Sequence, residues 1–467
     1  MPSDLLTQES FNRLAALALA AGTGDDVVVS VSESDGGTTR FANNQVTQNV
    51  HTRRRSVAVT AAFGQQRGSA STTDFSDDAV RDCVRRAEAV ARAAPADPEH
   101  LPALSPQKYP LLASYRPETA AAGPERRLAA VREAIERCAV AKLEGAGIVS
   151  SSSSAEGVAA KTGLAAFERR TEAAFSLTAT GPDSTGWVSN ASRSFDDLGV
   201  TDRTQAAIEK AQRSAKPREI PAGRYTVILE PAAVAGLLGP LIGALDAKSY
   251  YKSTSPVAGK LGQPLIDPRL SLRNRPDHPQ LLGDAFNSYG LPSDMHTWID
   301  RGVLARLSYD RFTAQEHGVE PTFGLDAPYF WGENTAANHG LGHGPETGTS
   351  GGATSSPPNG SGAVDSIDEL IRGTRRGVLV TNFWYIRGVN PTDLTLTGMT
   401  RDGTFLIEDG HIASGLIHFR WHDSPLRVFN AVEAYTRPMD AITMERGKML
   451  LPAMRIRDFN FSSVTRF

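Results

Sequence analysis

The sequence predicts an α+β protein whose two halves are built differently. Three observations lead to this prediction. Amphipathic helices flank β-rich stretches in the first half, this order occurs twice, and the second half is dense in β-branched and aromatic residues. We therefore expect an N-terminal domain of repeated helix–β-meander–helix units. A C-terminal, mainly antiparallel β domain with a few helices should follow it.

The first unit begins with an amphipathic helix. Phe11, Leu14 and Leu17 recur at helical spacing, and Gly22 is a typical helix end. Strand candidates follow at residues 27–31, in a short piece around Phe41, and at residues 57–63. A second helix is predicted to begin after Ser76, which has the residue type of an N-cap and precedes two aspartates.

The same order recurs from Pro124 onward. Pro124 suits the first turn of a helix, and Leu128, Val131, Ile135 and Cys138 continue at helical spacing. Strand candidates lie at 146–150 and 175–179, with a serine run at 150–154 that is typical of a strand end, and a fourth helix is expected at 202–215. Short echoes, such as VTA at 59–61 and LTA at 177–179, support a repeat.

The second half contains more strand candidates than the first. The segment at 378–386 reads VLVTNFWYI, which has high β-propensity. Further strands are predicted at 225–229, 404–407, 412–419 and 431–435. The dipeptides Asp402-Gly403 and Asp409-Gly410 are predicted to form hairpin turns.

A change in composition suggests where the two domains meet. The text KPREIPAG at 216–223 has the character of a linker, so we expect domains at 1–220 and 221–467. Residues 338–363 are rich in glycine and serine, and we interpret them as a mobile loop inserted in the second domain.

Composition narrows the class of protein. The chain has 49 Lys and Arg against 52 Asp and Glu, and the net charge of −3 argues against a nucleic-acid partner. We expect no membrane span, because no stretch of eighteen apolar residues occurs. The N-terminal segment has the pattern of an amphipathic helix and not of a signal peptide. With two cysteines, Cys83 and Cys138, the chain fits a reducing compartment, and we expect it to be cytoplasmic.

Four segments carry a resemblance to a known family. Residues 221–262 combine a strand, an apolar helix and a Ser/Thr-rich turn, and residues 282–311 contain Asp and Gly positions around a Gly-x-Leu segment. Thr381-Asn382 is followed by Gly388, and the first half contributes FANNQVTQNVHTRRRSVAVTA. In this order the segments resemble the TldD/PmbA metallopeptidase family, from about residue 8 to the end of the chain.

The zinc motif of that family is missing from this chain. The family's catalytic branch carries H-E-x-x-x-H on the apolar helix, where two imidazoles share a zinc ion and the glutamate accepts a proton from zinc-bound water. A cysteine near the C-terminus supplies the third ligand. Here Leu238, Gly239 and Gly243 align with His, Glu and His, residues 231–252 offer only Asp246, and no cysteine follows Cys138. The resemblance therefore implies the PmbA/TldE-like branch that lacks the zinc motif, with no catalytic, metal-binding or cofactor-binding residue.

The helix that replaces the motif is predicted to be a packing element. Its apolar residues lie on one helical face and are Val234, Leu237, Leu238, Leu241, Ile242 and Leu245. Pro240 lies inside and should kink the helix, at a cost of ~3 kcal/mol unless packing compensates. Three glycines in the same helix would let a neighbouring element approach closely.

Two histidine pairs are the remaining metal-site candidates. His418 and His422 lie four apart in a predicted strand, so both could point to one face and bind a metal with Asp423 or Glu433. We interpret them as ordinary strand residues, because two histidines alone are a weak signal. His339 and His343 lie in the Gly-rich loop near Glu333 and Glu346, and a mobile loop does not preorganise a site.

The resemblance implies a non-catalytic subunit. It would pair with a zinc-bearing TldD-like subunit as a heterodimer, with zinc in the partner, and the pair would cleave unfolded or short peptides and peptide precursors. Two alternatives remain open. The chain could be an independent metal-dependent hydrolase that uses a non-family site, or a homodimeric scaffold that binds peptides.

Overall fold

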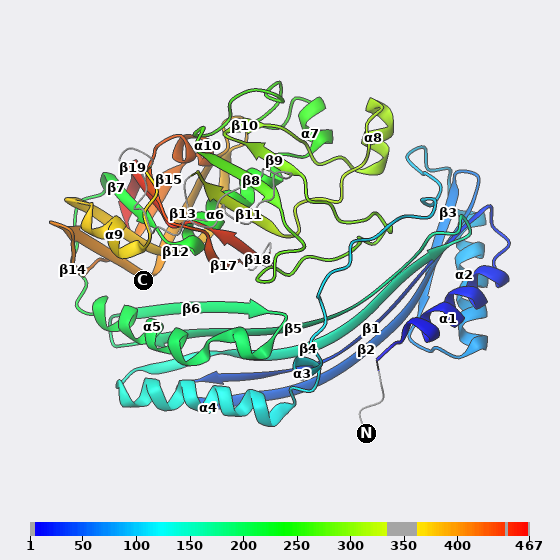
Figure 1. Ribbon diagram of the computed structural model, residues 1–467, viewed down its shortest axis with the longest axis horizontal. Coiled ribbons are helices and arrows are strands. Elements are labelled where there is room, and N and C mark those ends of the chain that lie inside the picture. Colours follow the sequence, from blue (N-terminus) through cyan, green and yellow to red (C-terminus); the bar gives the residue numbers. More distant parts are fainter. Residues whose placement is uncertain (1–4, 334–361, 444–446, 466–467) are drawn as a thin grey trace, which may run out of the picture.

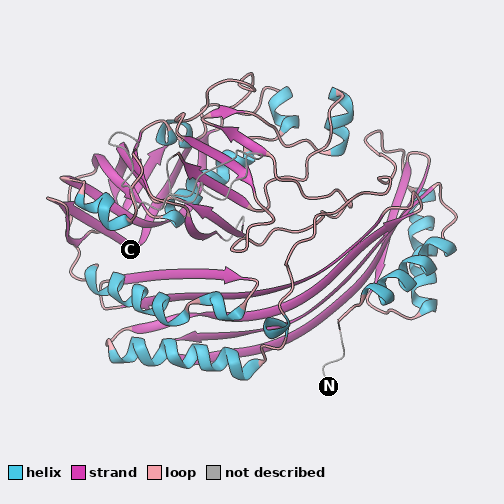
Figure 2. Ribbon diagram, in the orientation of Figure 1, coloured by secondary structure: helices cyan, strands magenta, loops and turns pink. Residues whose placement is uncertain are grey.

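A long curved sheet supports the whole molecule. The computed structural model describes residues 5–333, 362–443 and 447–465. In Figure 1, helices lie along the outer face of this N-terminal sheet, and the C-terminal half sits over one end of its inner face. Figure 2 shows that strands dominate both halves. The α+β prediction is confirmed.

The N-terminal sheet has six antiparallel strands in the order β3-β2-β1-β4-β5-β6. Their bounds are β1 Asp26–Ala42, β2 Gln45–Phe63, β3 Gln66–Thr72, β4 Glu144–Ala160, β5 Ala165–Thr180 and β6 Thr185–Ser192. The predicted strands at 27–31 and around Phe41 are two parts of the single strand β1, and the serine run 150–154 lies inside β4. The sequence prediction divided these strands because their middle parts carry glycine, which has low β-propensity, and polar serine and threonine, which interrupt the apolar alternation.

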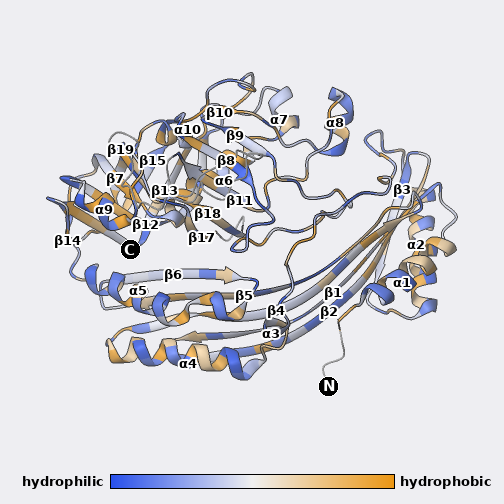
Figure 3. Ribbon diagram, in the orientation of Figure 1, coloured by the Kyte–Doolittle hydropathy of each residue, from blue (hydrophilic) through white to orange (hydrophobic). Residues whose placement is uncertain are grey.

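Helices flank each half of this sheet. They are α1 Gln8–Ala21 and α2 Asp77–Ala93 around β1–β3, and α4 Pro124–Val140 and α5 Val200–Arg213 around β4–β6, with a short α3 at Pro117–Ala120. Figure 3 shows that hydrophobic and hydrophilic residues alternate along α4. The inward residues of the helices form two separate apolar clusters, and Cys83 and Cys138 are each buried in one of them. The helix, three strands, helix order thus occurs twice, as the sequence predicts.

The C-terminal half contains two mixed sheets. One has the order β10-β9-β8-β11-β18-β17, and the other has the order β12-β7-β19-β15-β13-β14 with β16 attached to β19. An additional β12–β13 pairing closes β12, β7, β19, β15 and β13 into a ring. The first sheet comprises β8 Leu270–Asn274, β9 Thr297–Asp300, β10 Val303–Leu304, β11 Pro328–Gly332, β17 Met439–Thr443 and β18 Gly447–Leu451. The second comprises β7 Gly223–Leu229, β12 Arg376–Asn390, β13 Thr395–Glu408, β14 His411–Gly415, β15 Phe419–Asp423, β16 Val432–Tyr435 and β19 Met454–Val464.

Three features of this half differ from the prediction. Most pairings are antiparallel, but β7 with β12 and β11 with β18 are parallel, so the sheets are mixed. Asp402-Gly403 is not a hairpin turn, because both residues lie inside β13, whereas Asp409-Gly410 does turn β13 into β14. The predicted strand 412–419 is divided between β14 and β15.

Several sequence predictions remain untested. Whether 1–220 and 221–467 fold as independent domains stays a prediction. The Gly/Ser-rich loop at 338–363 lies, apart from Gly362 and Ala363, outside the described residues, and so do His339, His343 and Glu346. Within the described ranges, no helix combines the length and the apolar character needed to cross a bilayer.

A buried lysine joins the two halves. Lys448 on β18 donates from Nζ to the backbone oxygen of Ala191 at 2.6 Å and to Asn190 Oδ1 at 3.1 Å, both on β6. It also lies 2.9 Å from Asp440 Oδ1, while Arg203 of α5 lies 3.0 Å from Asp440 Oδ2. Because the Lys448 side chain is almost fully buried, these partners must compensate its desolvation.

Replacing this lysine should weaken the whole fold. We expect Lys448→Met to lower the free energy of unfolding by about 3 kcal/mol, because the partners of a buried charge lose their counterpart. Guanidinium chloride unfolding followed by circular dichroism measures the change. Lys252→Met, at an exposed position, is the matched control and should change stability little. Equal stabilities of the two variants would contradict the role given to Lys448.

Candidate functional site

The apolar helix α6, Pro231–Gly243, lies in the core of the C-terminal half. Glu230 precedes it as N-cap and donates its backbone N–H to Val380 O, and Pro231 occupies the first turn. The helix contacts strands of both sheets, β7 and β12 of the second and β17 and β18 of the first. It therefore joins the two sheets into one hydrophobic core.

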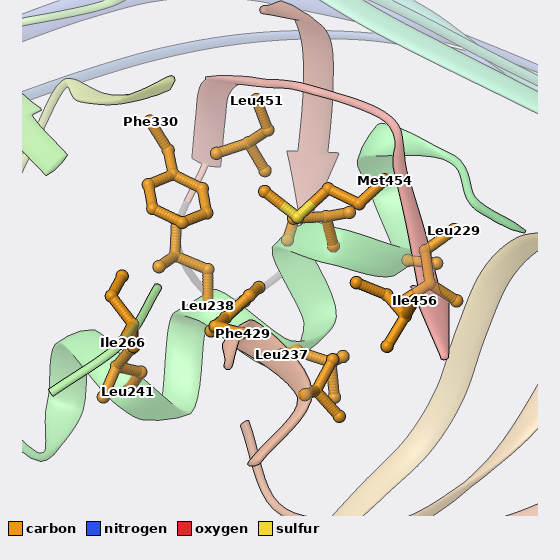
Figure 4. Packing of buried hydrophobic residues seen from close by; sticks show 14 of the residues in the cluster. Leu229, Leu237, Leu238, Leu241, Ile266, Phe330, Phe429, Leu451, Met454 and Ile456 are labelled. Atoms are coloured by element: carbon orange, nitrogen blue, oxygen red, sulfur yellow. The ribbon is translucent and has the colours of Figure 1, made fainter. Parts of the chain in front are cut away.

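The inward side chains of α6 are sealed from solvent. Leu237, Leu238 and Leu241 have no exposed surface, and Figure 4 shows them among other apolar side chains. The labelled neighbours are Leu229, Ile266, Phe330, Phe429, Leu451, Met454 and Ile456. Burial of side chains of this size stabilises the fold by roughly 1.5–3 kcal/mol each. The prediction of a packing helix is confirmed, but the helix is buried on more than one face, because Ala233, Val234 and Ala235 are as inaccessible as the leucines.

The helix continues through Pro240 to Gly243 as one element. Pro240 cannot donate a hydrogen bond to the preceding turn, so the packing of the neighbouring leucines must offset its cost. Gly236 allows close packing as predicted, since a Cβ there would lie 2.9 Å from Ile386 Cδ1 of β12.

The three positions that align with the zinc motif carry no metal-binding atoms on their side chains. Leu238 is buried in the core, and Gly239 and Gly243 have no side chain at all. The nearby Asp246 is the N-cap of α7, Ala247–Tyr251, where its Oδ2 accepts from Ser249 N at 2.8 Å. Zinc requires nitrogen, thiolate or carboxylate donors. The residues present around α6 do not fit a zinc ion.

The remaining described residues offer no alternative cluster. Across residues 5–333, 362–443 and 447–465, no group of three or more His, Cys, Asp or Glu side chains is arranged to hold a metal ion.

The structure separates His418 from His422. His418 precedes β15 and is half-buried, with Nδ1 3.3 Å from Thr400 Oγ1 and 3.2 Å from Thr404 Oγ1. His422 lies within β15 and is exposed. The predicted shared strand is not observed, because β15 begins at Phe419 and His418 lies outside it.

The carboxylates expected to join these histidines are engaged elsewhere. Asp423 Oδ1 accepts from Arg427 Nε at 2.5 Å, and Glu433 Oε2 accepts from Arg455 Nε at 3.1 Å. Glu333, which was considered together with His339 and His343, donates its backbone N–H to Arg269 O. The ion pairs of Asp423 and Glu433 and this backbone hydrogen bond hold the fold together.

The sequence pattern did not single out Glu230, a charged residue beside α6. Glu230 lies just before the 231–252 window, and its Oε2 is 2.6 Å from Lys210 Nζ of α5. Thr381 donates to Glu230 Oε1 at 3.4 Å. This ion pair fastens the start of α6 to the N-terminal half. No local sequence signal pairs residues so far apart in the chain.

Comparisons with known proteins agree with this architecture. A family model described as PmbA/TldA metallopeptidase C-terminal domain matches residues 222–463, and one described as PmbA/TldA metallopeptidase domain 1 matches residues 27–91. Metalloprotease PmbA of Escherichia coli O157:H7 is 23% identical over 325 residues, which cover 66% of this chain and 71% of that protein.

Two solved structures share the fold over almost the whole chain. TldE from Thermococcus kodakarensis matches with a TM-score of 0.82 at 17% identity, covering 97% of this chain and 99% of that chain. A putative modulator of a DNA gyrase from Thermotoga maritima matches with a TM-score of 0.80 at 19% identity and the same coverage. At these identities the matches speak to the fold.

His418 should make stability depend on pH. Burial lowers the pKa of His418 from 6.5 to about 4. Between these values the unfolded chain binds the proton and the folded chain does not, so the free energy of unfolding falls as pH falls through this window, by at most about 3 kcal/mol.

A variant without His418 isolates this effect. We expect the stability of His418→Asn to depend less on pH between 6.5 and 4 than that of the unmodified protein, whereas exposed His422→Gln should retain the full dependence. The difference between proteins is the relevant quantity, because Asp326, whose pKa burial raises to about 6, titrates in the same window with the opposite sign. Parallel pH profiles for His418→Asn and the unmodified protein would contradict the assignment.

Proposed function

Because the chain belongs to the PmbA/TldD metallopeptidase family, we propose that it is a non-catalytic, PmbA/TldE-like subunit of a peptide-cleaving complex. The proposed partner is a TldD-like subunit that carries the H-E-x-x-x-H motif and the zinc ion. The substrates would be unfolded or short peptides and peptide precursors. The proposal includes a cytoplasmic location and no contact with nucleic acid.

One observation carries this proposal. The helix that holds the zinc motif in the catalytic branch is here an apolar core helix, with Leu238, Gly239 and Gly243 at the positions of the motif's His, Glu and His. Introducing His or Glu at Leu238 would require burying a polar group where leucine, phenylalanine and methionine side chains now pack. The apolar packing around Leu238 therefore supports a subunit that binds no metal ion at α6.

A subunit without a metal can still promote hydrolysis. It can hold a peptide in the geometry that the partner's metal site requires, and positioning of this kind lowers the barrier without any proton transfer. The two halves are joined by buried or half-buried ion pairs, those of Lys448 and of Lys210 with Glu230, and such a junction is consistent with a subunit that presents one fixed surface.

Co-expression with a zinc-bearing homologue tests the proposal. We expect the two chains to elute together on size exclusion, with peptidase activity on an unfolded peptide only when both are present. Zinc content measured by plasma emission spectroscopy should be one ion per pair and should remain when this chain is replaced by its Leu261→Ala variant, at an exposed position.

Three results distinguish the alternatives. Stoichiometric zinc and peptide cleavage by this chain alone would overturn the proposal in favour of an independent hydrolase. A stable homodimer that binds peptides and ignores the zinc-bearing homologue would favour the scaffold. A complex whose activity does not change when this chain is omitted would also contradict the proposed role.

A further inference from the structure

A cavity of about 1050 Å³ lies between the two halves. Its walls come from the β5–β6 turn of the N-terminal sheet, from β12 and β13, and from the residues that precede β15. In Figure 1, β6 and β13 belong to the facing halves, and contacts between these two strands bring the walls together. A volume of this size accommodates a short peptide segment.

Asp402 is aimed into this cavity by a distortion of β13. The register between β12 and β13 shifts at this point, so Asp402 and Gly403 form a bulge. Asp402 has φ +55°, and Gly403 has φ +128°. A Cβ at Gly403 would lie 2.6 Å from Thr381 Oγ1, so glycine is needed there. A strained backbone that redirects a charged side chain is common at binding sites.

The carboxylate of Asp402 is only partly compensated. Its residue is 7% exposed. Burial raises the pKa of Asp402, although Arg401, a hydrogen bond from Thr185 and the charge of Lys210 act in the opposite direction. Arg401 Nε stays 3.5 Å from Asp402 Oδ2, which is longer than a close charge-assisted hydrogen bond. A second cation could therefore approach this carboxylate favourably.

An aromatic ring completes the arrangement. Trp384 lines the cavity and is 46% exposed, and the Arg401 guanidinium lies 4.4 Å from its ring centre. The Arg401 side chain is itself 41% exposed, so solvent is available to it when a ligand cation takes its place. Arg401 thus shows that the space between Trp384 and Asp402 holds a cation.

The charges of the wall also favour a cation. The charged lining residues are Asp183, Arg401 and Asp402, which leaves an excess of one negative charge. Leu416 and Ile417 add apolar surface beside them. The preferred ligand therefore combines a positive charge with an apolar group.

We propose that this cavity binds a primary ammonium group attached to an apolar peptide segment, with the ammonium between Asp402 and Trp384 in place of Arg401. The N-terminal amine of a peptide and a lysine side chain share this chemistry. Only the choice of a peptide as ligand rests on the proposed function. The site itself rests on the bulge, the buried carboxylate and the ring.

Three probes separate the sources of the ammonium group. Isothermal titration calorimetry on the full chain would compare phenylalanyl-alanine amide, its N-acetyl form, and N-acetyl-phenylalanyl-lysine amide. We expect the free-amine or the lysine probe to bind and the acetylated phenylalanyl-alanine amide to bind at least about tenfold more weakly, since the charge-assisted contact is lost. Which of the two cationic probes binds identifies the source.

Three substitutions test the assigned residues. Asp402→Asn should weaken binding about tenfold, whereas Arg401→Gln should leave it unchanged or tighten it, because an internal competitor is removed. Asp458→Asn and Arg420→Gln, which lie outside the cavity, are the matched controls. Circular dichroism melting checks that each variant is folded, and Trp384→Leu, at the exposed rim, provides a second variant that should weaken binding without entering the core.

The opposite pattern would overturn the inference. Loss of binding in Arg401→Gln with no effect of Asp402→Asn would mean that the cavity takes a carboxylate. Equal binding of the acetylated and free-amine probes, or no binding of any probe, would equally end it. Because these measurements use the chain alone, their failure is distinguishable from failure of the co-elution and peptidase experiment.

Discussion

The burial of α6 is the constraint on which the rest of the structure depends. This helix is apolar on the faces that meet two different sheets, and its leucines belong to one cluster with residues of β7, β8, β11 and β19. A set of polar metal ligands at the same place would lose its hydration inside this core, and that desolvation would destabilise the fold. The same apolar residues of α6 therefore both fill the core and leave no side chain that could bind a metal ion.

The docking of the two halves follows from that core. With α6 fixed between its sheets, Glu230 at its start can hold Lys210 of α5, and Lys448 on β18 can reach Asn190 of β6. At the other side of the contact, Arg170 lies 2.8 Å from Asp284. Charged contacts of this kind are directional, so they fix one orientation where apolar contacts alone would allow sliding. That orientation sets the β5–β6 turn opposite β13 and creates the cavity between them.

The sequence predicted element types better than element lengths. The helices around Leu14, Val84 and Val131 follow 3.6-residue periodicity, which depends on local residues only. By contrast, β1 continues through Ser34, Gly36 and Thr38 because β2 and β4 pair with it on both sides. The strand β2 follows β1 directly, but β4 is distant in the chain, and no pattern within β1 itself reveals either pairing. The same reason hid the Lys210–Glu230 pair.

The clearest error of prediction coincides with the most unusual backbone in the cavity. Asp-Gly favours a hairpin turn because both residues tolerate positive φ, and Asp402 and Gly403 do adopt positive φ. The local chemistry was thus interpreted correctly, but the chain uses it for a bulge, since the strand resumes at Thr404 and still pairs with Val380. Sequence rules fail in this way where a strand is distorted for a purpose other than packing. The misassigned dipeptide is for that reason an argument for the cavity, because a strand that served packing alone would gain nothing from burying Asp402 beside an exposed tryptophan.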